Sequence, residues 1–482
     1  MLISTRYYKY YFTQRIRFVT EKIMKKRQPI DEHFFGTANI WKILFRVAPP
    51  VMLAQLILAL YNIVDSFFVG KYSGDGLTAL SVIYPVQLIV MALAIGTGVG
   101  VNTYMAKQYA LNKPQEAQRT AGAGLAVALV MWAVFSVASI FVLKPYAESS
   151  ASSPQAVKYT IDYGIIVCVG SLGLFCESIW TKAHQARGNM FTPTVAQIAG
   201  AVTNIILDPI LIFGWWIFPE MGIKGAAIAT VAGQFVAAVI VGVKGCSKPP
   251  KLKESGAYVK QIFKLGYPSI LMQAMFTVYI GALNLILANR FNDQTVTVLG
   301  LYYKLQAFFF IPLFGLQTCI VPILSYNYTN KRYDRCKKIF ADSLIISAVC
   351  MTLGILCFEI IPTQLISIFS KDQKVFEIGK TAFRIIGLSF LPAVFSMMSP
   401  IFFQAIGYSK TSTFLSVLRQ LICLVPVFWG FSYVGLNYCW IAFPVAETVT
   451  TAIGVILYFS ATKKWKAEQK ATPPVAAKMP TE

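Results

Sequence analysis

The chain has 482 residues, of which 56% are hydrophobic and only 13% are charged, and its formal net charge is +22. Soluble domains carry about 25% charged residues, so this composition excludes an ordinary soluble protein and indicates a polytopic membrane protein. The nine cysteines form no CxxC pair, and the sequence has neither a Walker A nor a GxSxG motif. Metal frameworks, ATP-driven pumping and serine hydrolysis are therefore not indicated.

The chain begins with a basic, aromatic segment that lacks the apolar core and cleavage site of a signal peptide. We expect residues 1–41 to form a cytoplasmic N-terminal tail. Met24 precedes the run KKR, so translation from Met24, with residues 1–23 as a surplus extension, is one interpretation. A tail that lies on the membrane surface and is held by anionic lipid is the other.

Apolar runs recur along the rest of the chain, separated by short polar breaks. A membrane-spanning helix needs about 20 mainly apolar residues. Helices are expected because each backbone amide in lipid must be satisfied within its own segment. The fold class that follows is an all-α polytopic membrane protein with 12 transmembrane helices. The expected spans are roughly 42–70, 79–106, 120–143, 157–182, 191–217, 225–244, 260–290, 295–325, 339–361, 376–403, 411–433 and 438–461.

The second half of the chain repeats the first. FRVAPPVMLAQ (45–55) aligns with FKLGYPSILMQ (263–273), and LSVIYPVQ (80–87) aligns with LGLYYKLQ (299–306). Each copy holds an even number of spans, so both copies enter the membrane in the same orientation. We expect two parallel six-helix bundles related by a pseudo-two-fold axis along the membrane normal. The expected units are an N-terminal lobe (42–245), a cytoplasmic linker without regular structure (246–258), a C-terminal lobe (259–462) and a disordered cytoplasmic tail (463–482).

Lys and Arg are distributed unevenly between the loops. They crowd into the tail before the first span and into the loops after even-numbered spans, for example Lys331, Arg332 and Arg335. By the positive-inside rule both termini face the cytoplasm, in a multi-pass protein of the cytoplasmic (inner) membrane whose immediate partners are membrane lipids. No nucleic-acid partner is expected, because no stretch outside the membrane is long enough to form a basic domain.

Two acidic residues of the first half lie deep in the expected spans, where a charged side chain costs about 2.5–3.5 kcal/mol unless it is paired or hydrated. Asp65 lies late in the first span and Asp208 late in the fifth, and both spans run outward, so the acids are at similar depth. Asn204, one turn before Asp208, and Thr230 in the sixth span can add neutral oxygens. Such a cluster is suited to hold H⁺ or Na⁺. The alternative is that Asp65 only caps its helix near the outer surface.

The second half carries different charges within its spans. Lys304, Arg384 and Arg419 accompany an acid, Glu447, that can pair with a base. We expect Glu447 to form a buried ion pair with Lys304 or Arg384, and this pair to orient the lobe rather than to act in transport.

Two further features of the first half have expected structural roles. Glu177 lies near Lys182 at the cytoplasmic end of the fourth span, which favours a local interfacial salt bridge. Pro50 lies fifteen residues before Asp65 in the same helix. Proline inside a membrane helix often marks a bending point, so Pro50 is a candidate hinge.

Four segments of the first half carry a resemblance to a known family: VDSFFVG (64–70), QARGNMFTP (185–193), NIILDPILIFG (204–214) and GIKGAAIAT (222–230). They resemble the multidrug and toxic compound extrusion (MATE) transporters, bacterial type, and the likeness extends over nearly the whole membrane part of the chain. The resemblance implies two six-helix bundles in a V around a central cavity, with rocker-type exchange between outward-open and inward-open states.

The resemblance also implies an activity and a site. Asp65 and Asp208 would be the carboxylates of the coupling cation, Asn204 a ligand or hydrogen-bond partner, Thr230 an additional contact, and Pro50 the bending point of the first helix. Na⁺, if it is the coupling ion, would bind at Asp65, Asp208 and Asn204. The expected protein is not an enzyme and needs no cofactor. It is a monomeric secondary active antiporter that exports amphipathic or cationic drugs in exchange for H⁺ or Na⁺.

Two alternative functions are considered. A flippase for lipid-linked oligosaccharides shares the architecture of the wider superfamily and would need basic residues for a pyrophosphate. Cleft-facing Lys304, Arg384 and Arg419 would favour it, whereas the same residues paired with acids or facing lipid would not. An integral-membrane transferase would need clustered His, Asp or Ser groups at one membrane face, and none stands out.

Overall fold

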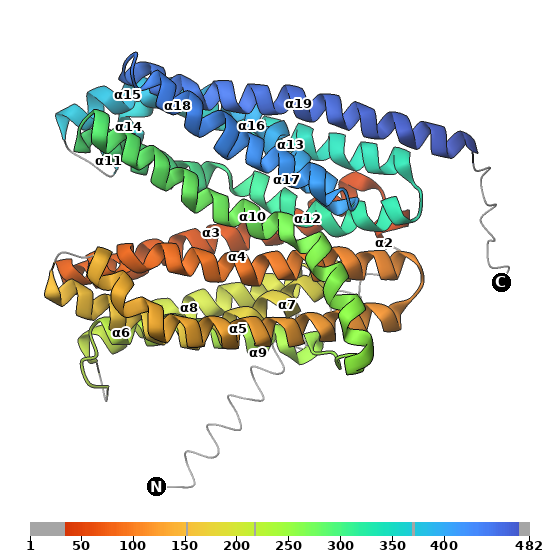
Figure 1. The fold of residues 1–482 in the computed structure, drawn as a ribbon, viewed down its shortest axis with the longest axis horizontal. Helices are drawn as coiled ribbons and strands as arrows, with labels where there is room; N and C mark the ends of the chain where they lie inside the picture. Colours follow the sequence, from red (N-terminus) through yellow and green to blue (C-terminus); the bar gives the residue numbers. More distant parts are fainter. Residues whose placement is uncertain (1–33, 151–152, 216–217, 369–371, 472–482) are drawn as a thin grey trace, which may run out of the picture.

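The protein consists of two helical lobes that face each other (Figure 1). A computed structural model describes residues 34–150, 153–215, 218–368 and 372–471. Within these residues, nine helices are long and apolar enough to cross a membrane alone, and three bent helix pairs bring the number of spans to twelve. The expectation of an all-α protein with twelve spans is confirmed. The expectations for residues 1–33 and 472–482 lie outside the described residues.

The first lobe holds six spans, preceded by a short helix, α2 (Phe34–Thr37). Its fourth span is bent by 41° where α6 meets α7. The hydroxyl of Ser171, at this junction, donates to the carbonyl oxygen of Cys168 at 2.7 Å. The helices are α3 (Ile40–Tyr72), α4 (Gly74–Ala110), α5 (Pro114–Ser150), α6 (Pro154–Gly170), α7 (Leu172–Ala186), α8 (Phe191–Phe213) and α9 (Ile223–Gly245).

The second lobe also holds six spans, two of which are bent, by 53° between α11 and α12 and by 55° between α15 and α16. One span contains a π-helical stretch between two α-helical parts. The helices are α10 (Leu252–Arg290), α11 (Asp293–Phe309), α12 (Ile311–Thr329), α13 (Tyr333–Ile360), α14 (Pro362–Ser367), α15 (Gln373–Gly387), α16 (Phe390–Ala405), α17 (Ser409–Val417), η1 (Leu418–Leu424), α18 (Val425–Phe431) and α19 (Leu436–Ala471).

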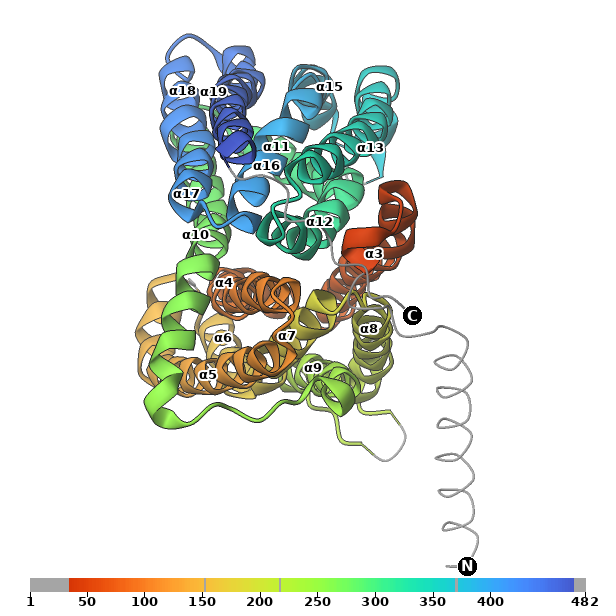
Figure 2. The ribbon, with the colours of Figure 1, turned by 90° about the vertical axis from the view of Figure 1, so that its right-hand side faces the viewer.

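The contact between the lobes repeats itself. Helix α4 of the first lobe packs on α10 of the second, and α12 of the second packs on α3 of the first. At the first contact Gly96 faces Ile270, and at the second Gly315 faces Met52. In the alignment of the two copies Gly96 corresponds to Gly315 and Met52 to Ile270, so one contact is made twice. Figure 2 shows α3 and α10 on opposite flanks of the junction, as a two-fold relation requires.

The lobes are joined near one end of the molecule. Cys319 donates to the carbonyl oxygen of Val47 at 3.3 Å, and Ser325 donates to that of Thr103 at 3.0 Å. Val47 lies early in α3 and Thr103 late in α4, while Cys319 lies in the middle and Ser325 in the last third of α12. From there the ribbons of the two lobes diverge toward the ends of α3 and α10 (Figure 1). The joined end is the one for which the sequence predicts a cytoplasmic location.

The linker between the lobes is more ordered than expected. We expected residues 246–258 to lack regular structure, but α10 already begins at Leu252. The hydroxyl of Tyr258 donates to a carboxylate oxygen of Glu116 at 2.5 Å, which ties the start of α10 to the first lobe. This partly buried contact stabilises helical turns that composition alone did not indicate.

The C-terminal tail was predicted to be disordered from residue 463, and this is wrong up to Ala471, where α19 ends. The reason is an aromatic anchor in the last turns of α19. Trp465 is fully buried and stacks on Tyr333 with a centroid distance of 5.1 Å. Tyr333 also donates to Glu468 at 2.6 Å.

Candidate functional site

Two acids from different helices meet inside the first lobe. Asp65 lies on α3 and Asp208 on α8, and their exposed fractions are 7% and 0%. The two carboxyl groups lie within hydrogen-bonding reach of each other. The structure therefore brings together the two residues that the sequence placed at similar depth, and Asp65 is not an exposed cap.

Asn204 and Thr230 complete the predicted set. Asn204 lies one helical turn before Asp208, and its amide nitrogen is 3.3 Å from Asp208 Oδ1 and 3.4 Å from Thr230 Oγ1. Thr230 can come so close because α8 and α9 touch through glycines. A Cβ on Gly233 would lie only 2.6 Å from the carbonyl oxygen of Gly200, so only glycine permits this separation of the helices.

The cluster has more acceptors than donors. Buried oxygens of Asp65, Asp208, Asn204 and Gln234 have no hydrogen-bond partner among the described residues. None of the ion pairs in this part of the chain involves Asp65 or Asp208. A buried charge is costly unless it is paired, so the carboxyl pair needs a cation. A proton shared between the acids meets this need, and a small hard cation held by several oxygens would also do so.

Two tyrosines next to the acids were missed by the sequence reasoning. Tyr61 lies one turn before Asp65 on α3 and close enough to interact electrostatically with both acids. Tyr163 on α6 is 2% exposed, contacts Thr230, and accepts a hydrogen bond from Gln87 at 3.4 Å. The spacing of four residues before Asp65 could have revealed Tyr61. No sequence signal pointed to Tyr163, which reaches the site from the bent span.

Glu447 forms the buried ion pair that was expected in the second lobe, but its partner is neither Lys304 nor Arg384. Glu447 on α19 pairs with Arg419 of η1 at 3.0 Å, and both side chains are 13% exposed. Ser396 also donates to Glu447. Arg384 instead lies 3.9 Å from Glu359 at a more exposed position, and Lys304 is exposed on α11. The prediction of a pair between Glu447 and Lys304 or Arg384 is therefore wrong.

The duplication explains this choice of partner. In the alignment Arg419 corresponds to Gly200 and Glu447 to Gln234. Gly200 and Gln234 lie on α8 and α9, which pack closely in the first lobe, and η1 and α19 pack in the equivalent way. The pair thus joins the fifth and sixth spans of the lobe. Because Arg384 and Arg419 both have acidic neighbours, they do not form the set of free cations that a pyrophosphate would need.

Two other expectations for the first lobe concern the Glu177 side chain and Pro50. Glu177 is 8% exposed and accepts from Thr181 at 2.7 Å, while Lys182 donates to Gln185 at 3.0 Å. The predicted interfacial salt bridge between Glu177 and Lys182 is therefore wrong, because both side chains find neutral partners within the helix. Pro50 lies inside α3, which is helical throughout, so bending at Pro50 stays a prediction.

Comparison with known proteins identifies the family. A sequence profile of the MatE family matches residues 50–210 and 268–429, one match in each lobe. Multidrug export protein MepA of Staphylococcus haemolyticus is 23% identical over 438 residues, which cover 89% of this chain and 95% of that protein. A protein of Shewanella oneidensis named FAD transporter is 23% identical over 439 residues, which cover 89% of this chain and 96% of that protein.

Solved structures have the same fold. An outward-facing multidrug resistance MATE family transporter of the MOP superfamily matches with a TM-score of 0.84 and 20% identity, covering 92% of this chain and all of the other. A MATE crystallised in complex with MaL6 matches with a TM-score of 0.83 and 20% identity, covering 89% of this chain and 98% of the other. The chain therefore belongs to the MatE family and is a MATE transporter of the membrane.

Proposed function

We propose that this transporter is a secondary active antiporter that exports amphipathic, cationic organic compounds in exchange for H⁺ or Na⁺. The observation that carries the proposal is the buried cluster of oxygens around Asp65 and Asp208, which has no basic partner in the described part of the chain. The relatives described as multidrug exporters support the class of cargo.

Coupling requires that the cation binds more tightly to one conformation than to the other. Helix α3 provides a physical link for such a preference. It holds Asp65 in its second half and contacts the other lobe through Val47 and Met52 in its first half. Pro50 lies at this contact. Occupation of the acid pair is thus expected to change how α3 packs against α8, and with it the contact between α3 and α12.

The first lobe alone carries the coupling site in this proposal. In the second copy the positions of Asp65 and Asp208 are taken by Leu283 and Val427, which are apolar. One cation site per chain is consistent with a monomer that needs no further cofactor. We place both termini in the cytoplasm, and membrane lipids around the twelve spans.

The proposal is tested by transport in proteoliposomes. The purified protein is reconstituted, and movement of a fluorescent lipophilic cation is followed under a pure pH gradient and, separately, under a pure Na⁺ gradient. We expect one of the two gradients to drive accumulation against the concentration gradient of the probe. Accumulation that persists after an ionophore has abolished both gradients would contradict ion coupling and would leave a different energy source to be found.

A further inference from the structure

A short segment of the first lobe is docked onto the second lobe at the joined end of the molecule. Asn327 donates to the carbonyl oxygen of Phe35 at 3.0 Å, and Arg332 donates to that of Gly36 at 2.5 Å. Arg335 donates to the carbonyl oxygens of Phe35 and Ala38. Side chains from the end of α12 and the start of α13 thus hold in place the segment that leads into α3. We call the boundary between the two lobes at this end of the molecule the seam, and both of its sides are ordered.

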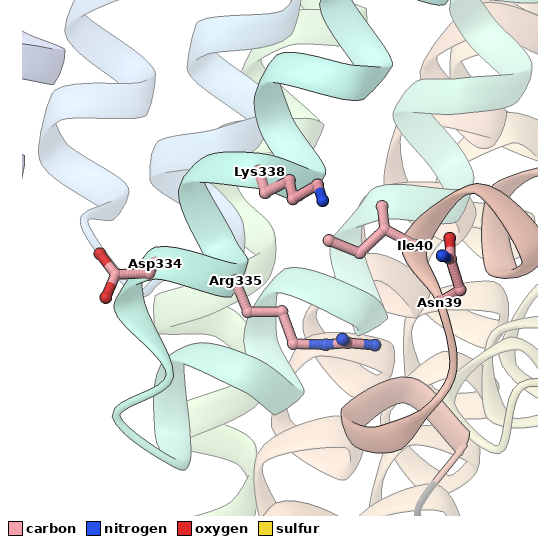
Figure 3. A pocket seen from close by; sticks show the side chains of 5 residues that line it. All are labelled: Asn39, Ile40, Asp334, Arg335 and Lys338. Carbon is pink, nitrogen blue, oxygen red and sulfur yellow. The ribbon is translucent and has the colours of Figure 1, made fainter.

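Beside this docked segment lies a cavity of about 330 Å³ that is open to the surface. Its walls come from both lobes: Asn39 and Ile40 at the start of α3, and Asp334, Arg335 and Lys338 at the start of α13. Figure 3 shows the cationic ends of Arg335 and Lys338 directed toward Asn39 and Ile40. Asp334 points away from them in the same view. The cavity therefore presents two cations, one amide and one apolar side chain.

The positive charges of Arg335 and Lys338 are not neutralised by an acidic side chain of the cavity. Asp334 is paired with Lys337 at 3.1 Å. Among the described residues, Lys338 has no hydrogen bond or ion pair, and the bonds of Arg335 go to uncharged carbonyl groups. On the other wall Lys42 follows Asn39 by three residues on the same face of α3. An anion with several oxygen atoms would find preorganised donors here.

The depth of the cavity points to the membrane interface. Trp41 and Phe45, in the first turns of α3, are stacked with a centroid distance of 5.7 Å and are 38% and 64% exposed. Exposed aromatic side chains at the end of a membrane helix lie at the level of the lipid headgroups. This end is predicted to be cytoplasmic, and the cytoplasmic leaflet is rich in anionic lipid, which attracts basic residues next to the membrane.

We propose that the seam between the lobes binds the phosphate group of an anionic phospholipid from the cytoplasmic leaflet, between Arg335 and Lys338 on α13 and Asn39 on α3. Ile40 then contacts the glycerol part of the lipid. Because the two walls belong to different lobes, a bound lipid stabilises the arrangement in which these ends of the lobes are together. The proposal concerns lipid binding and does not depend on the coupling site or on the cargo.

The test measures lipid binding to the purified full chain in neutral detergent by native mass spectrometry. Phosphatidylglycerol is titrated and compared with phosphatidylcholine. Lys338→Gln is expected to weaken phosphatidylglycerol binding about fivefold, the factor for one lysine at an anionic surface. Asp334→Asn is expected to strengthen it, because a negative charge is removed beside the cavity. The matched control is Lys113→Gln, an exposed lysine at the predicted cytoplasmic end of the first lobe, which is expected to change nothing.

Three results would overturn the assignment. Equal binding of phosphatidylcholine would exclude recognition of the anionic headgroup. An equal effect of Lys338→Gln and Lys113→Gln would show that only total charge matters. Displacement of the lipid by millimolar inorganic phosphate would identify a site for a soluble anion instead of a lipid. Thermal unfolding without lipid shows whether each variant is folded, and Asp334→Asn decides the question if Lys338→Gln is not.

Discussion

At the scale of single residues, the two lobes differ in whether their buried charged side chains are paired with an opposite charge. The first lobe places two acids, Asp65 and Asp208, beside each other without a basic partner among the described residues. The second lobe places Arg419 against Glu447 in a closed pair. The first arrangement stays incomplete until a cation binds, whereas the second is complete in itself. We therefore expect the acids of the first lobe to bind a cation, and the ion pair of the second lobe to have a structural role.

The structural role of the Arg419 pair predicts a pattern of stabilities. Arg419→Gln or Glu447→Gln alone should lower the free energy of unfolding by roughly 3–5 kcal/mol, because one buried charge is left without its partner. Changing both, to Met and Leu, should restore most of this loss. The exposed pair of Arg384 and Glu359 is the control, and Arg384→Gln should cost at most about 1 kcal/mol.

Denaturant or thermal unfolding of the purified variants measures these differences. If the double variant is no more stable than the single variants, the loss of stability does not come from an unpaired buried charge, and the prediction is wrong. If Arg384→Gln is as harmful as Arg419→Gln, burial is not what sets the effect.

At the scale of helices, the close approach of α4 to α10 depends on glycines, two of which lie in α4. A Cβ on Gly100 would lie 2.1 Å from the carbonyl oxygen of Ile262, and one on Gly96 would lie 2.8 Å from the backbone nitrogen of Ile270. Both obstacles include backbone, which cannot rotate away. At the equivalent contact in the other direction, Gly315 faces the flexible side chain of Met52 at 2.6 Å. Of the two equivalent contacts between the lobes, the one between α4 and α10 is thus tighter than the one between α12 and α3.

This asymmetry predicts an order of effects. Gly100→Ala should separate the helices and destabilise the protein by about 1–3 kcal/mol, as overpacking does, and should slow transport. Gly315→Ala should cost less, because Met52 can change its rotamer. Gly281→Ala, in the partner helix α10 but with open space around it, is the control and should be neutral or slightly stabilising.

Unfolding and transport assays on the three variants check this order. Equal effects of Gly100→Ala and Gly281→Ala would mean that helix propensity decides the outcome and the interface does not.

At the scale of the whole molecule, the sequence predicted the frame well. The repeat and the even number of spans per copy predicted two lobes related by a two-fold axis, and the contacts of Gly96 with Ile270 and of Gly315 with Met52 follow that relation. The depth of Asp65 and Asp208 could be read from their positions within outward-running spans. These features depend on periodicity and on counting, which a single sequence contains.

What the sequence could not predict depends on tertiary packing. The partner of Glu447 is fixed by which helices lie side by side. Arg419 was not chosen as this partner, although it aligns with Gly200, which lies next to the closely packed α9. Tyr163 enters the site because α6 is bent against α7, and no local pattern predicts the direction of that bend. Trp465 extends α19 into a tail whose composition indicated disorder.

The central claim is that Asp65 and Asp208 bind the coupling cation, and substitution of each acid in proteoliposomes tests it most directly. The control is Asp342→Asn, which changes a buried acid of the second lobe that is 7% exposed. We predict that Asp65→Asn and Asp208→Asn fold normally but lose gradient-driven accumulation of the organic cation, down to the level of empty vesicles, whereas Asp342→Asn retains it. Full gradient-driven accumulation by Asp208→Asn and Asp65→Asn would contradict the account.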